Sequence, residues 1–217
     1  MSAWRQPYAA YLFDLDGTLI DTAPDLNLAL NHCLAQAGLP GVDEAHTRHW
    51  VGHGARVLIE QALHHHQIEH PIEPLFEAFL AFYVENVAVQ SRFYPTVEDT
   101  LKQLRECGAQ LAVVTNKLAH FSERLLQELG AREYFDTVIG GDTASAPKPD
   151  PAPIELCLQH LGVGVDDALF VGDSETDVRA AQAAGMRVVC LRDGYNHGID
   201  VSTLHPDAVI DRFAELL

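Results

Sequence analysis

The sequence is poor in basic residues and in long apolar runs. Its 217 residues include 14 lysines and arginines against 31 aspartates and glutamates, so the formal net charge is −17. A chain this acidic repels nucleic-acid phosphates and anionic membranes. No apolar run reaches the roughly 18 residues expected of a membrane span. We therefore expect neither nucleic acid nor a membrane as a partner.

Cysteine is also scarce. The four cysteines, at positions 33, 107, 157 and 190, are far apart and form no C-x-x-C motif. This usage predicts buried, reduced thiols in a cytoplasmic protein. Residues 1–10 lack a signal-peptide pattern, which supports the same cytoplasmic expectation. Apolar residues make up 47% of the chain, which excludes disorder and is enough for a core without disulfides or structural metal.

From residue 96 onward, amphipathic helices alternate with short apolar strands. We predict helices over residues 96–106, 121–129, 153–161 and 177–184. We predict strands over residues 8–15, 111–114, 137–139, 168–171, 188–191 and 208–210. Strands and helices that alternate across short loops favour a parallel sheet covered on both faces. The expected fold class is therefore α/β, with a Rossmann-like doubly wound parallel sheet.

The first strand has no immediate crossover helix. Instead, the pattern predicts helices over residues 24–37, 54–64 and 74–87, with no convincing strand between residues 21 and 90. We interpret this stretch as an inserted domain. The predicted division is an α/β core of residues 1–20 and 91–217, with an α-helical cap of residues 21–90. The expected hinges lie near residues 19–22 and 91–95.

Polar side chains follow the predicted strands, at the edge where parallel sheets bind their ligands. They are Asp14, Asp16, Thr115, Asn116, Lys148, Asp173 and Asp177. Carboxylates that converge repel one another, and a hard divalent cation relieves that repulsion. Oxygen ligands without nearby histidine or cysteine favour Mg²⁺ over Zn²⁺. The sequence thus predicts a magnesium site at this edge.

Only three lysines occur in the chain, at positions 102, 117 and 148. Lys102 belongs to an amphipathic helix and is interpreted as structural. Lys117 directly follows Asn116, so it stands where it would rim the site. Lys148 is flanked by two prolines that fix its loop geometry. We predict Lys148 as the lysine that binds phosphate.

Four short segments, in this order, resemble the motifs of the haloacid dehalogenase superfamily of phosphatases. They are residues 13–19 (Phe-Asp-Leu-Asp-Gly-Thr-Leu), residues 114–116 (Val-Thr-Asn), Lys148, and residues 172–177 (Gly-Asp-Ser-Glu-Thr-Asp). The resemblance covers nearly the whole chain, and the helical insert resembles the superfamily's small α-helical cap. It implies a Mg²⁺-dependent hydrolase of phosphomonoesters.

The resemblance also implies a role for each residue. Asp14 would attack phosphorus and form an aspartyl-phosphate, while Asp16 would serve as general acid and then general base. Mg²⁺ would be held by the Asp14 side chain, the Asp16 backbone carbonyl and Asp173, with Asp177 supporting a metal-bound water. The residues expected to bind the phosphoryl group are Thr115, Asn116 and Lys148.

Within the superfamily, further segments are similar to bacterial phosphoglycolate phosphatases. They are residues 50–56, 115–117, 138–142 and 194–198. The similarity implies 2-phosphoglycolate as substrate, a small anion that carries a carboxylate as well as a phosphate. Because the predicted cap contains no lysine, our candidate for binding that carboxylate is Arg56, with Arg48 and Arg92 as the alternatives.

Other functions are weighed against this one. Phosphonoacetaldehyde hydrolases of this superfamily use a lysine of the cap, and the predicted cap contains none. Haloacid dehalogenases lack the second acid of the first motif, which is present here as Asp16. A phosphatase or mutase for another small ester, such as a sugar phosphate, stays open. A phospho-accepting signalling module is the non-enzyme alternative, although a cap has no purpose there. A catalytically dead binding protein would lack a motif residue, and none is missing. Monomer and homodimer both stay open.

Histidines are concentrated in the predicted cap. Eight of the twelve lie between residues 32 and 70, including the triplet at residues 64–66. Consecutive side chains on a helix point in different directions, so the triplet does not converge on one ion. We predict a polar, solvated face of the cap here rather than a zinc site.

Overall fold

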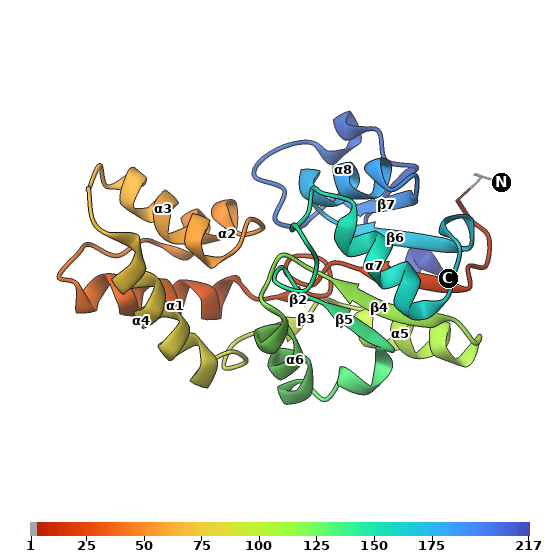
Figure 1. The fold of residues 1–217 in the computed structure, drawn as a ribbon, viewed down its shortest axis with the longest axis horizontal. Coiled ribbons are helices and arrows are strands. Elements are labelled where there is room, and N and C mark those ends of the chain that lie inside the picture. Colours follow the sequence, from red (N-terminus) through yellow and green to blue (C-terminus); the bar gives the residue numbers. More distant parts are fainter. Residues whose placement is uncertain (1–3) are drawn as a thin grey trace.

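Six parallel strands form the central sheet of this protein, as described by a computed structural model for residues 4–217. Residues 1–3 of the predicted core lie outside the described residues. The strands run in the order β5-β4-β1-β6-β7-β8 (Figure 1). Their bounds are β1 Ala10–Phe13, β4 Gln110–Val114, β5 Thr137–Ile139, β6 Ala168–Gly172, β7 Arg187–Leu191 and β8 Ala208–Ile210. The predicted α/β parallel sheet is confirmed.

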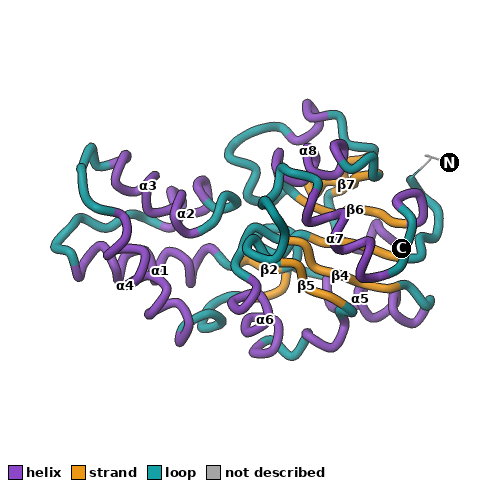
Figure 2. Tube along the Cα trace, viewed as in Figure 1, coloured by secondary structure: helices purple, strands orange, loops and turns teal. Residues whose placement is uncertain are grey.

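Helices cover both faces of this sheet (Figure 2). One face packs against α5 (Val97–Glu106) and α6 (Ala119–Glu128), and the other against α7 (Ala152–Leu161) and α8 (Glu175–Ala183). Tyr11 and Phe13 belong to the apolar core of the first face, and Ala10 and Leu12 to that of the second. Because successive side chains of a strand point to opposite faces, a strand buried on both is apolar throughout. Short 3₁₀ helices follow at Arg132–Tyr134, Val165–Asp167, Val201–Leu204 and Phe213–Leu216.

Four further helices form a separate layer beyond the end of the sheet (Figure 1). They are α1 Ala23–Gln36, α2 Glu44–Trp50, α3 Ala55–His65 and α4 Ile72–Glu85. We call this helical layer the cap. The chain enters it through β2 (Ile20–Asp21) and leaves through β3 (Arg92–Phe93), and these two strands pair antiparallel. The predicted domain boundaries, at residues 20/21 and 90/91, lie beside this pair of strands. The division into core and cap at those residues stays a prediction.

Three local features differ from the sequence analysis. The α2 helix was not predicted, because it has only seven residues and Thr47 is its one buried side chain. The β2–β3 pair was not predicted either, because two residues per strand are too few to show a period. The expectation of four buried cysteines was wrong for Cys107, which lies at the exposed end of α5, while the other three are buried.

Length and apolarity together decide whether a helix can cross a membrane. Among residues 4–217, no helix has enough of both.

Candidate active site

The ends of three neighbouring strands assemble the site. Asp14 follows β1, Thr115 follows β4 and Asp173 follows β6. Because β1 pairs in parallel with both β4 and β6, these residues meet at one edge of the sheet. This is the carboxyl edge of the sheet, where the sequence analysis expected a ligand site. The same edge faces the cap (Figure 1).

Three buried carboxylates lie together at this edge. Oxygens of Asp14, Asp173 and Asp177 come within 4.8 Å of one another. The ammonium of Lys148 lies among them, 2.8 Å from Asp14 Oδ1 and 2.7 Å from Asp177 Oδ1. When all four groups are ionised, one positive and three negative charges leave 1 − 3 = −2 in a buried space. An uncompensated buried charge is costly, and one divalent cation would cancel it.

The pKa values of the cluster reflect burial first and this excess of negative charge second. Burial raises the pKa of Asp14 to about 7, although Lys148 lowers it and Asp177 adds to the rise. Burial also raises the pKa of Asp173 well above its usual range, with Asp177 and Asp14 adding to the effect. Burial alone would lower the pKa of Lys148, but Asp14 and Asp177 outweigh it and the pKa is raised. The carboxylates therefore favour a further cation beside them.

Asp173 is held in place from two sides. Its Oδ1 accepts a hydrogen bond from the Thr18 hydroxyl, and its Oδ2 accepts one from the backbone N–H of Tyr195. Two glycines let the backbone pass close to it: a Cβ at Gly194 would overlap Asp173, and one at Gly17 would lie 2.6 Å from Asp173 Oδ2. Gly17 also has a φ of +92°, which favours glycine. The crowded, all-oxygen donor set of Asp14 and Asp173 fits a hard divalent cation.

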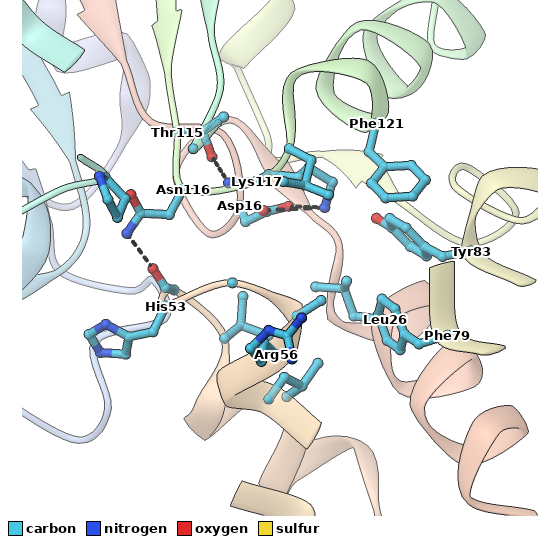
Figure 3. A pocket seen from close by; sticks show the side chains of 18 of the residues that line it. Asp16, Leu26, His53, Arg56, Phe79, Tyr83, Thr115, Asn116, Lys117 and Phe121 are labelled. Atoms are coloured by element: carbon cyan, nitrogen blue, oxygen red, sulfur yellow. Dashed lines mark hydrogen bonds and ion pairs between the residues drawn. The ribbon is translucent and has the colours of Figure 1, made fainter. Parts of the chain in front are cut away.

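Asp16 lies apart from these three acids, on the cavity side. It accepts a hydrogen bond from the Thr22 hydroxyl at 2.6 Å. It accepts a second from Lys117 Nζ at 3.0 Å, which Figure 3 shows. The Lys117 side chain is only 6% exposed. Burial would lower its pKa, but Asp16 and Tyr83 outweigh this and the pKa is raised. Lys117 is therefore a buried cation in the wall of the site. The sequence analysis predicted a position at the rim.

The second motif is positioned by hydrogen bonds within the protein. The hydroxyl of Thr115 accepts the backbone N–H of Lys117 at 3.2 Å. The side-chain amide of Asn116 donates to the carbonyls of Gly52 and Lys148, both at 3.0 Å, so it joins the cap to the core. Both N–H groups of that amide are engaged in this structure, and the phosphate-binding role of Thr115 and Asn116 stays a prediction.

A cavity of about 390 Å³ lies between the sheet edge and the cap (Figure 3). Its polar end is formed by Asp14, Asp16, Thr115 and Lys117. The rest of the wall is mainly apolar and comes from cap and core alike. Its members include Leu26, Val51, Leu58, Phe76, Phe79, Leu80, Tyr83 and Phe121. A substrate bound at the acids would thus have its leaving group enclosed by the cap.

Arg56 lines this cavity but already has partners. Its guanidinium donates to both carboxylate oxygens of Glu73, at 2.8 and 3.1 Å, and lies 4.4 Å from the centre of the Phe76 ring. Its side chain is 46% exposed. Arg48 pairs with acidic residues and Arg92 with backbone carbonyls. The carboxylate-binding role predicted for Arg56 stays a prediction.

Tyr195 is a site residue that the sequence analysis did not single out. Its hydroxyl accepts the backbone N–H groups of Thr22 and Ala23, both at 2.9 Å, and donates to Asp21 at 2.6 Å. Its own backbone N–H binds Asp173. Tyr195 thus connects the acidic cluster to the entry of the cap. The resemblance of residues 194–198 marked this loop, but nothing in the spacing indicated these contacts.

Histidines from the cap and the core also meet near the site. The rings of His53 and His197 stack with centroids 5.0 Å apart, and His197 Nδ1 lies 2.6 Å from the His49 carbonyl oxygen. Within residues 4–217, three side chains of the His, Cys, Asp and Glu types lie close enough together to share a metal ion: Asp14, Asp173 and Asp177. The histidines are not part of this group.

Comparison with known proteins identifies relatives of the whole chain. The model of the family described as haloacid dehalogenase-like hydrolase matches residues 11–191. The phosphoglycolate phosphatase of Nitrosococcus oceani is 43% identical over 209 residues, which cover 94% of this chain and 93% of that protein. The phosphoglycolate phosphatase of Yersinia pestis is 45% identical over 208 residues, which cover 94% of this chain and 90% of that protein.

Solved structures show the same fold. A crystal structure of a predicted phosphoglycolate phosphatase from Haemophilus somnus has a TM-score of 0.91 and 36% identity, and covers 96% of both chains. A mutant of CbbY from Rhodobacter sphaeroides, in complex with xylulose-(1,5)bisphosphate, has a TM-score of 0.81 and 28% identity, and covers 96% of both chains.

Proposed function

Because the chain belongs to the haloacid dehalogenase-like hydrolase family and is a phosphomonoester hydrolase, we propose that it converts 2-phosphoglycolate to glycolate and phosphate. One observation carries the proposal: Asp14, beside Lys148 and two further buried acids, opens into a cavity that the cap closes. Relatives over 40% identical bear the name phosphoglycolate phosphatase, which supports this substrate.

The first step is phosphoryl transfer to Asp14. A carboxylate oxygen of Asp14 forms a bond to phosphorus while the bond between phosphorus and the ester oxygen breaks. The Lys148 ammonium, 2.8 Å from Asp14, stabilises negative charge on the phosphoryl oxygens. Asp16 gives its proton to the ester oxygen, so glycolate leaves as an alcohol rather than as an alkoxide.

The second step is hydrolysis of the aspartyl-phosphate. Asp16, now ionised, accepts a proton from a water molecule whose oxygen bonds to phosphorus. The bond between phosphorus and the Asp14 oxygen breaks, which releases phosphate and restores both carboxyl groups. Asp16 faces the cavity beside Asp14, so one side chain serves both leaving group and water.

A divalent cation completes the proposed site. Asp14, Asp173 and the backbone carbonyl of Asp16 would hold it, with Asp177 close by, and Mg²⁺ is the ion that these hard oxygen donors favour. When bound, it supplies positive charge that offsets the phosphoryl oxygens and the buried carboxylates.

A phosphatase or mutase for a sugar phosphate is the second candidate. The similarity to CbbY, whose mutant was solved with a sugar bisphosphate, favours it. The cavity also favours it, because about 390 Å³ is more room than a two-carbon leaving group needs. The candidates differ in which leaving group the cap accepts.

The experiment that separates them is a panel of phosphomonoesters, assayed with Mg²⁺ and ranked by kcat/KM. We expect 2-phosphoglycolate to rank above glucose and xylulose phosphates. A sugar phosphate at the head of the ranking would replace the proposed substrate and leave phosphatase chemistry intact. The lifetime of the phosphoenzyme tests the signalling alternative, because a signalling module would retain its phosphoryl group long after the phosphodonor is removed.

A further inference from the structure

Lys117 carries a charge that the proposed chemistry does not use. Its ammonium lies in the cavity wall, 3.0 Å from Asp16 Oδ1, and its side chain is 6% exposed. Within residues 4–217, Lys148 has two carboxylate partners, whereas Asp16 is the one carboxylate that pairs with Lys117. An ammonium has three N–H donors in tetrahedral directions, so it can donate to an oxygen of Asp16 and to an anion at the same time.

Tyr83 lies on the other side of this ammonium. Lys117 Nζ is 4.8 Å from the centre of the Tyr83 ring, and Figure 3 shows the hydroxyl directed toward Lys117. Burial raises the pKa of Tyr83 to about 12, so the hydroxyl keeps its proton. The Tyr83 oxygen is buried, and its O–H has no acceptor among residues 4–217. Buried polar groups are nearly always satisfied, so this hydroxyl is available to a ligand.

The position of these donors fits a short leaving group. Asp16 must reach the ester oxygen in order to protonate it, and Lys117 is within hydrogen-bond distance of Asp16. A carboxylate separated from that ester oxygen by a single methylene therefore falls beside Lys117 and Tyr83. A longer chain would carry its carboxylate past them, into the apolar part of the cavity.

The arginines of the cap are less suitable. Arg56 is bound through two hydrogen bonds to Glu73 and is about half exposed. Recruiting it would break that bidentate pair, whereas Lys117 is already buried beside the reacting groups. Charge-assisted bonds are stronger where water is excluded.

We propose that Lys117 and Tyr83 form the subsite that binds the carboxylate of the substrate, and that this subsite selects phosphate esters of short α-hydroxy acids. The inference rests on the proposed function and deepens it. The carboxylate accepts from the Lys117 ammonium and from the Tyr83 hydroxyl, while Asp16 keeps its own bond to Lys117.

The test compares 2-phosphoglycolate with ethyl phosphate, which has a methyl group in place of the carboxylate. The measured quantity is the ratio of the two kcat/KM values for each protein, with Mg²⁺ present. Loss of one member of a buried charge pair predicts that Lys117→Met lowers this ratio by about 30- to 1,000-fold. Lys117→Arg should keep part of the preference, and Tyr83→Phe should lower it by about fivefold, as for one hydrogen bond.

Lys102→Met is the matched control, because it removes a lysine from the exposed side of α5, and its ratio should equal that of the wild type. Each ratio comes from one preparation, so a partly unfolded variant does not distort it.

An equal loss on both substrates in Lys117→Met would overturn the proposal and leave Lys117 serving Asp16 alone. A selective loss in Arg56→Met, with Lys117→Met retaining the preference, would give the role to Arg56. A wild type without any preference for 2-phosphoglycolate would refute the proposed function as well.

Discussion

Asp177 binds Lys148 through one carboxylate oxygen at 2.7 Å, and its other oxygen accepts the backbone N–H of Ser174 at 3.0 Å. The second bond fixes Asp177 at the start of α8, so the helix terminus positions the lysine. Both Asp177 oxygens are therefore engaged within the protein. Both oxygens of Asp173 are engaged as well, but their partners are the Thr18 hydroxyl and the Tyr195 backbone N–H rather than Lys148. Only Asp177 of the two therefore anchors the lysine among residues 4–217.

This difference predicts different metal requirements for two matched variants. Asp173→Asn should raise the Mg²⁺ concentration for half-maximal activity by more than about tenfold, because a ligand charge is lost. Asp177→Asn should mainly lower kcat, because Lys148 loses its anchor. Titrating the rate with Mg²⁺ after EDTA treatment measures both. Equal shifts in the two variants would make Asp177 a metal ligand like Asp173.

Asp14→Asn should abolish turnover and leave the fold intact. Removing a covalent nucleophile costs about 10⁴- to 10⁶-fold in rate. Burial raises the pKa of Asp14 to about 7, so its ionised form is unfavourable in the metal-free protein. The neutral amide should therefore match or exceed the wild type in thermal midpoint, as measured without metal. Turnover near the wild-type rate in a clean preparation would remove Asp14 from its role.

Much of the fold was predictable because its signals are local. Each strand of the sheet is a short apolar run, and the predicted helices of the core match α5 to α8 within two residues. The α2 helix escaped prediction because its start depends on one contact: Asp43 accepts the backbone N–H of His46 at 2.8 Å. No apolar stripe accompanies that contact.

The site was predictable only where position along the chain determines position in space. Asp14, Thr115 and Asp173 could be placed together because each follows a strand of one parallel sheet. Tyr195 could not, because its contacts with Thr22 and Asp173 join segments that are more than 20 residues apart through loops. The depth of Lys117 was likewise hidden, since it depends on how α4 packs over the site.

Asp25 should contribute strongly to stability. It is fully buried in α1 and accepts hydrogen bonds from the backbone N–H groups of Gln90 and Ser91 and from the Ser91 hydroxyl. Asp25→Ala would leave these donors unsatisfied and should lower the free energy of unfolding by about 2–4 kcal/mol. Chemical denaturation measures the loss. Asp43→Ala, which removes an exposed helix cap, should cost much less, and equal losses would contradict this reasoning.

Asp16→Asn should lower the rate by an amount that depends on the leaving group of the substrate, as expected for loss of a general acid. With 2-phosphoglycolate the rate should fall on the order of 10²–10⁴-fold, because an alkoxide is a poor leaving group without a proton. With p-nitrophenyl phosphate the loss should be much smaller, since p-nitrophenolate leaves unprotonated. Single-turnover rates on both substrates measure this. An equal loss on both would limit Asp16 to its hydrogen bonds with Thr22 and Lys117.

The His53–His197 stack should contribute a loss of stability in mild acid. The raised pKa of Asp14, about 7, contributes the opposite slope over the same range, because the folded protein then binds the proton before the unfolded chain does. His53 is exposed on one side, and its pKa is lowered, chiefly by partial desolvation and then by His197, while Glu175 opposes the shift. In the unfolded chain His53 has its ordinary pKa of about 6.5, so as the pH falls through that value the unfolded state binds the proton first and stability falls. Thermal midpoints from about pH 7.5 to about pH 5.5 measure the slope around that ordinary histidine pKa. His53→Phe keeps an aromatic ring without a charge and removes this contribution, so its thermal midpoint relative to the wild type should rise as the pH falls. His64→Phe, on the exposed face of α3, should show no such trend. A difference between His53→Phe and the wild type that is independent of pH would contradict the role given to His53.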